Sequence, residues 1–137
     1  MQVTVTNAQR ETPVPVARMA RMARCAVKRL RIRQPGTMAI TFIDSRTMRA
    51  LNKQFKRHDR DTDVLSFRYD GERVAGEVLI APRQAQRYAA AHDLPYLDEL
   101  SRYVVHGILH WTGLEDRTAA QQRAMRRAED RLLNGRA

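Results

Sequence analysis

Residues 106–116 read HGILHWTGLED, and this segment holds the most specific chemistry in the chain. His106 and His110 stand at positions i and i+4, so on a helix they share one face, with Cβ atoms about 6 Å apart. That separation suits two imidazoles on one tetrahedral metal ion. Gly113 permits a tight turn after the helix, and the turn can bring Asp116 back toward the same point. The segment therefore predicts a metal-binding helix whose ligands are His106, His110 and Asp116.

The spacing H-x-x-x-H-x-x-G-x-x-D resembles that of metzincin-type zinc peptidases, with one difference. A zincin places Glu directly after the first histidine as the general base, and here that residue is Gly107. Loss of such a base removes proton transfer worth about 100- to 10,000-fold in rate. The metal ligands are thus present, whereas the peptidase machinery is incomplete.

The alternative is that both histidines are packing residues of an apolar helix. His106 follows the apolar residues 103–105, so burial is expected, and two buried imidazoles without partners would be costly. This cost favours metal binding. Three protein ligands also leave a fourth position open, as in catalytic zinc sites, which supply a water of lowered pKa. Cys25 is distant in sequence, although distance alone does not exclude it as a fourth ligand.

The hydrophobic pattern predicts an α+β fold: one small mixed sheet of about four strands packed with about five helices, including a zincin-like metal helix. Strands are expected at 2–6, 38–43, 62–67 and 75–81, with a hairpin turn at Asp70-Gly71. Helices are expected to start near Pro13 and Pro15, after a cap at Asp44 or Ser45, and near Pro82, Pro95 and Thr118, the last with a Thr118–Gln121 capping box. No regular βαβ alternation, repeat or linker is visible. One metallohydrolase domain over residues 1–137 is the simplest interpretation.

The composition favours a soluble protein of a reducing compartment. The chain has 137 residues, of which 43% are hydrophobic and 29% charged, with a single cysteine that cannot form an internal disulfide. No secretory apolar segment is visible near the N-terminus, and no apolar run approaches the roughly 20 residues that span a bilayer. We expect a cytoplasmic protein without a membrane partner.

The charge favours a polyanionic partner. Lys and Arg total 25 against 15 Asp and Glu, a net charge of +10, which suits nucleic acid better than a membrane surface. The alternative is that arginine is simply the preferred soluble residue of this chain. The run KRHDRD at 56–61 reads as an exposed loop, and the basic face of the first long helix reads as a solvated face that could also touch RNA or protein.

These motifs resemble the YbeY family of rRNA maturation factors. HGILHWTGLED is similar to the family's H-G-x-L-H-L-x-G pattern, whose glycine after the first histidine corresponds to Gly107. Upstream, KRHDRDTDVLSF at 56–67 is similar to its RGKDxPTDVLSF, and GEVLI at 76–80 resembles its GDIxI strand. Downstream, MRRAE at 125–129 is similar to its closing helix. The resemblance covers about residues 37–133, with the motifs in the family's order.

The resemblance implies a zinc-dependent, single-strand-specific endoribonuclease acting in 16S rRNA maturation and ribosome quality control. RNA in the ribosome would be the main partner, with ribosomal proteins as further candidates. Lys56 and Arg57 would then contact phosphate and stabilise developing charge, with Arg60 as another candidate. Three positions depart from the family: Asp116 replaces the usual third histidine, Trp111 replaces leucine, and Lys56 stands where the family has arginine. A carboxylate is a competent zinc ligand, but lysine cannot reproduce bidentate arginine contacts.

Two other functions remain open from the sequence: a non-catalytic ribosome-assembly or RNA-binding factor with structural zinc, and a metallopeptidase with an unconventional base. No general base for RNA cleavage is evident. Ser66 is interpreted as a strand residue rather than a nucleophile, and Trp111 as a core residue rather than a base-stacking platform. Asp63 is expected either to support a metal-binding histidine or to cap its strand.

Overall fold

A four-stranded mixed sheet, in the order β1-β2-β4-β3, forms the centre of the computed structural model, which describes residues 1–55 and 63–134. Its strands are β1 (Gln2–Asn7), β2 (Thr37–Phe42), β3 (Val64–Arg68) and β4 (Val74–Ile80). β2 pairs in parallel with both β1 and β4, whereas β3 pairs antiparallel with β4. The α+β class and the mixed sheet expected from the sequence are confirmed. The pattern did not reveal that β1, the first helix and β2 form a parallel crossover unit.

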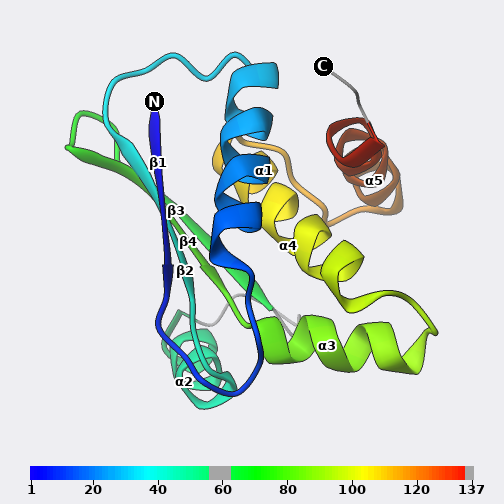
Figure 1. Ribbon diagram of the computed structural model, residues 1–137. Coiled ribbons are helices and arrows are strands. Elements are labelled where there is room, and N and C mark those ends of the chain that lie inside the picture. Colours follow the sequence, from blue (N-terminus) through cyan, green and yellow to red (C-terminus); the bar gives the residue numbers. More distant parts are fainter. Residues whose placement is uncertain (56–62, 135–137) are drawn as a thin grey trace.

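Five helices accompany the sheet in the described part of the chain: α1 (Val16–Arg29), α2 (Ser45–Phe55), α3 (Pro82–Ala91), α4 (Tyr96–Trp111) and α5 (Ala119–Asn134). α1 and α4 lie side by side on one face of the sheet, α1 against β1 and α4 against β3 and β4 (Figure 1). α3 and α5 pack on α4, so α4 is the central helix. Within residues 1–55 and 63–134, no helix has the length and apolar character needed to cross a membrane.

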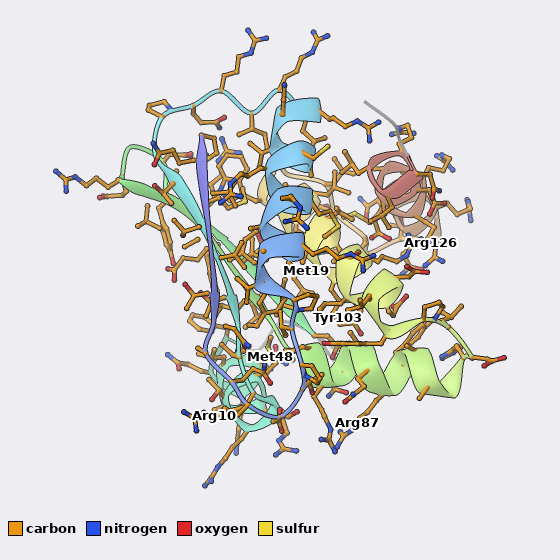
Figure 2. The ribbon with its side chains drawn as sticks, viewed as in Figure 1. Arg10, Met19, Met48, Arg87, Tyr103 and Arg126 are labelled. Atoms are coloured by element: carbon orange, nitrogen blue, oxygen red, sulfur yellow. The ribbon has the colours of Figure 1, made fainter. Side chains whose placement is uncertain are left out.

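The alternation of side chains along the strands divides the core between the two faces of the sheet. Val64, Val78 and Ile80 belong to the main core with residues of α1 and α4. Leu65 and Leu79, which point to the other face, cluster with Met48 of α2 and its neighbours. Met19 of α1 is fully buried in the main core, whereas Arg10 and Arg87 extend away from the ribbon (Figure 2). Both faces of the sheet are therefore covered.

The helix boundaries follow local hydrogen bonding that the sequence predicted. The backbone N–H of Thr47 donates to Asp44 Oδ1 at 2.7 Å, which caps α2. The N–H of Gln121 donates to Thr118 Oγ1, and the N–H of Thr118 donates to Gln121 Oε1, each at 3.1 Å. This reciprocal pair is the predicted capping box, and it fixes the start of α5 directly after the loop that carries Asp116.

Candidate metal centre

The last two turns of α4 bring His106 and His110 together. Their ring centroids are 4.5 Å apart, and the rings meet edge to face. Both side chains are partly exposed, at 25% and 28%, although the surrounding helix is largely buried. The i,i+4 spacing thus places two imidazoles on one accessible face, as predicted.

Gly113 reverses the chain and returns Asp116 to the histidines. Its φ of +108° is a left-handed conformation that favours glycine. The N–H of Leu114 donates to Leu109 O, and the N–H of Gly113 donates to His110 O, as in a Schellman turn. Asp116 Oδ2 then lies 3.4 Å from His106 Nε2 and 3.5 Å from His110 Nε2.

In each histidine, Nδ1, the ring nitrogen that does not face Asp116, hydrogen-bonds to an oxygen acceptor. His106 Nδ1 lies 2.6 Å from Glu129 Oε2, and His110 Nδ1 lies 2.9 Å from the carbonyl oxygen of Leu114. A carboxylate and a carbonyl accept hydrogen bonds, so each Nδ1 carries the hydrogen and donates. In the neutral rings, both Nε2 lone pairs then face Asp116. Such support of the far nitrogen is characteristic of metal-binding histidines.

The electrostatics of this cluster favour a cation. Burial opposes the charged form of His106, but hydrogen bonds and charge from Asp116 and Glu129 outweigh burial and raise the pKa of His106 to about 9. Burial and the neighbouring charge of His106 lower the pKa of His110. At neutral pH the ring of His106 therefore carries a second proton and is positively charged, stabilised by the two carboxylates. A bound metal ion would replace that proton, so metal binding would be coupled to proton release.

Two histidine nitrogens and one aspartate oxygen are donors that suit zinc, the metal that the sequence predicts. One ligand atom from each of His106, His110 and Asp116 can be chosen so that all three lie within 4.8 Å of one another. Zinc takes imidazole nitrogen and carboxylate oxygen, and catalytic zinc sites commonly have three protein ligands. The cluster can thus hold a metal ion, and its chemistry suits zinc.

Packing against the sheet explains why glycine follows the first histidine. A Cβ built on Gly107 would overlap Cγ1 of Val78 and lie 3.0 Å from Cγ1 of Val64. Ser66 Oγ also donates to the carbonyl oxygen of Gly107 at 3.0 Å. Position 107 therefore faces β3 and β4 at close range. A glutamate there would meet the sheet rather than the metal cluster.

Replacing Gly107 with alanine is expected to lower the free energy of unfolding by about 1–3 kcal/mol, the usual cost of overpacking a core. In an unobstructed helix the same change would stabilise the protein by about 1 kcal/mol. Urea unfolding of the metal-free protein measures the difference. Val78→Ala removes the overlapping methyl group, so the double variant should be more stable than the sum of the single effects predicts. Strict additivity would contradict this packing.

The remaining residues that the sequence singled out lie outside the histidine cluster or beyond the described residues. Trp111 is 3% exposed and donates from Nε1 to Ala75 O, which confirms a core role. Asp63 Oδ2 accepts a hydrogen bond from the Tyr103 hydroxyl at 2.9 Å. Cys25 is exposed on α1 and does not belong to the histidine cluster. Lys56, Arg57 and Arg60 lie outside the described residues.

Glu129 and Arg102 are residues of the cluster's surroundings that the sequence did not identify. Glu129 is 4% exposed on α5, where Oε1 accepts from Arg102 Nη1 at 2.8 Å and Oε2 faces His106. Arg102 also donates from Nη2 to Asp130 at 2.8 Å. The only sequence signal was the resemblance of residues 125–129 to the closing helix of the family. Glu129 lies 23 positions after His106, and no rule of sequence spacing predicts a pairing at that separation.

The fold and the site together define the class: an α+β protein with a His-His-Asp cluster, on a sheet-packed helix and its following turn, that can hold a metal ion. The sequence profile of the family described as Endoribonuclease YbeY matches residues 4–136. The chain belongs to this family, which is one of hydrolytic nucleases.

Individual relatives agree with this assignment. The chain is 33% identical over 99 residues to the endoribonuclease YbeY of Flavobacterium psychrophilum, covering 72% of this chain and 71% of the relative. It is 32% identical over 113 residues to that of Phocaeicola vulgatus, covering 82% and 78%. The solution structure of TM1509 from Thermotoga maritima superposes with a TM-score of 0.61 at 20% identity, covering 97% of this chain and 90% of that one. This last likeness supports the fold.

Proposed function

We propose that this protein is a zinc-dependent endoribonuclease that cuts single-stranded RNA. One observation carries the proposal: in a chain of the YbeY family, one nitrogen from each of two imidazoles and one carboxylate oxygen lie within 4.8 Å of one another. The curated relatives are named endoribonucleases. Zinc is the proposed metal because two imidazoles and one carboxylate match its preferred donors.

Each residue of the site has a defined task in this proposal. His106, His110 and Asp116 would hold the ion, while Glu129 and the carbonyl of Leu114 orient the two rings through their Nδ1 hydrogens. When bound there, zinc would supply a water of lowered pKa and a positive charge to polarise a phosphoryl oxygen. The partial exposure of both histidines leaves the cluster accessible to a substrate from solvent.

The substrate contacts are proposed from charge and family pattern. Lys56 and Arg57 would bind RNA phosphates and stabilise charge that develops during cleavage. The net charge of +10 supports a polyanionic substrate. We propose 16S rRNA in the cytoplasm as the physiological substrate, in maturation and quality control of the ribosome, with ribosomal proteins as further partners.

Cleavage by the reloaded protein tests this proposal. Metal-free protein is given zinc and incubated with an end-labelled single-stranded RNA, with the same RNA as a duplex, and with an unstructured peptide. We expect internal cuts in the single strand alone, lost with a chelator and restored by zinc. Cleavage that persists without metal would contradict zinc dependence. Zinc that raises thermal stability while the RNA is bound but uncut would instead indicate a non-catalytic RNA-binding factor.

A further inference from the structure

A basic hollow lies between the start of β1 and the C-terminal half of α1, apart from the metal cluster. Its volume is about 580 Å³, and basic side chains and an apolar floor line it together. The basic side chains are Arg24, Lys28, Arg31 and Arg33, and the apolar residues are Met1, Val3, Val27 and Ile32. We call the four basic residues the α1 basic surface. Among the residues that the structure describes, no acidic one lines the hollow.

A second hollow adjoins the first and extends its charge. It has a volume of about 540 Å³ and shares Arg24, Lys28 and Arg31 with its neighbour, adding Cys25 and Arg29. Helix α1 contains no acidic residue in its sequence VARMARMARCAVKR. The positive charge therefore forms one continuous area without a local counter-charge in its lining. Such an area attracts a polyanion strongly.

Arg31 holds a backbone conformation that its residue type disfavours. Its φ is +56°, in the left-handed region where glycine is preferred. The N–H of Arg31 donates to Lys28 O, and the N–H of Ile32 donates to Val27 O, so Arg31 is the residue that ends α1 in a Schellman turn. Glycine would serve this turn better. An arginine at this position, lining both hollows, points to a role for its side chain outside folding.

The α1 basic surface shares no residue with the metal cluster. α1 packs on β1, one edge strand of the sheet, and also on α4, whereas α4 packs on β3 and β4 as well (Figure 1). His106, His110 and Asp116 do not line either hollow, so a ligand on the α1 basic surface has a site of its own. A long polymer is the occupant that could engage both places at once.

We propose that the α1 basic surface is a second binding site for the phosphate backbone of single-stranded RNA, separate from the site of cleavage. Arginine and lysine on the rim suit phosphates, and the apolar floor suits the flat face of an unpaired base. This inference rests on the proposed function only in taking RNA as the polyanion. It implies that long single strands are held at two places, whereas short ones reach only one.

Two variants of Arg31 separate its charge from its backbone. Arg31→Gly removes the charge and relieves the left-handed conformation, so the midpoint of urea unfolding should rise while binding of a labelled oligouridylate weakens. Arg31→Gln removes the charge alone, so binding should weaken equally without the gain in stability. Each should reduce the slope of log Kobs against log salt by about 0.7, the value for one phosphate contact to a single strand. Arg87→Gln, an exposed arginine on α3 that extends away from the ribbon (Figure 2), is the charge-matched control and should leave binding near wild type.

Cys25 provides an independent readout because it is the only cysteine and is exposed beside this surface. Oligouridylate should slow its alkylation by iodoacetamide in the wild type and in His110→Ala. The protection should be lost in a variant with Arg24, Lys28 and Arg31 all changed to glutamine. That triple variant should also lose roughly 2 in salt slope and keep its zinc content.

The outcomes distinguish this inference from the proposed function. Unchanged slopes and an unprotected Cys25, in a wild-type protein that still cleaves RNA, would overturn the second site and leave the nuclease intact. Protection and reduced slopes in a protein that never cleaves RNA would support the surface and overturn the catalytic proposal. Protection of Cys25 by an acidic polypeptide but not by oligouridylate would assign the surface to a protein partner and overturn the inference.

Discussion

His110→Ala is expected to abolish stoichiometric zinc binding and RNA cleavage together. His110 is one of the three proposed ligands, and its Nδ1 donates to a backbone carbonyl, that of Leu114, in a part-buried contact. Its removal should therefore disturb the metal more than the fold. Loss of a partner outside the ligand shell typically costs 10- to 100-fold in metal affinity, so loss of a ligand should exceed 100-fold. Elemental analysis after gel filtration and a competition titration with a zinc indicator measure both quantities.

His92→Ala is the matched control. His92 lies at the end of α3, stacked on Tyr88 with a centroid separation of 3.9 Å, and is exposed. It should leave zinc content unchanged. Asp116→His installs the ligand type that the family resemblance gives as usual, and should retain zinc where Asp116→Ala loses it. Full zinc occupancy in His110→Ala would refute the three-ligand cluster as the metal site.

Local sequence rules predicted the parts of this protein that depend on short-range geometry. The i,i+4 histidines, the left-handed Gly113 and the Thr118–Gln121 capping box each act within a few residues, so spacing alone located them. The same argument placed the beginning of α3 at Pro82 and that of α4 next to Pro95. The convergence of the three proposed ligands was predictable because all of them lie within eleven residues of sequence, 106–116.

Long-range pairing was beyond those rules. The parallel register of β2 with β1 and β4 depends on crossover connections that periodicity does not reveal. The reason for Gly107 likewise depends on Val78 and Val64, which approach it only in the folded sheet. From the sequence, Gly107 was merely the absence of a zincin base. In the structure it is a position where α4 lies so close to β3 and β4 that a Cβ would overlap Val78.

Glu129→Gln is expected to lower zinc affinity by about 10- to 100-fold although Glu129 is not a proposed ligand. The carboxylate accepts from Arg102 at one oxygen and from His106 Nδ1 at the other. An amide has one oxygen, which should remain toward the guanidinium because two donors cannot face each other. Its NH2 group would then point at His106 Nδ1 and favour the tautomer with hydrogen on Nε2. That hydrogen would occupy the coordinating position.

Asp130→Asn tests whether this effect passes through His106 or through Arg102. Asp130 also accepts from Arg102, at 2.8 Å, but its side chain is 46% exposed. If Glu129 positions His106, Asp130→Asn should leave zinc affinity near wild type while Glu129→Gln lowers it. NMR of the imidazole nitrogens should show the tautomer of His106 changed only in Glu129→Gln. Glu129→Ala is less informative, because breaking a buried ion pair costs about 3–5 kcal/mol in stability by itself.

Equal losses of zinc affinity in Glu129→Gln and Asp130→Asn, with an unchanged His106 tautomer, would assign both residues to holding α5 against α4. An unchanged affinity in Glu129→Gln would remove Glu129 from the metal centre altogether.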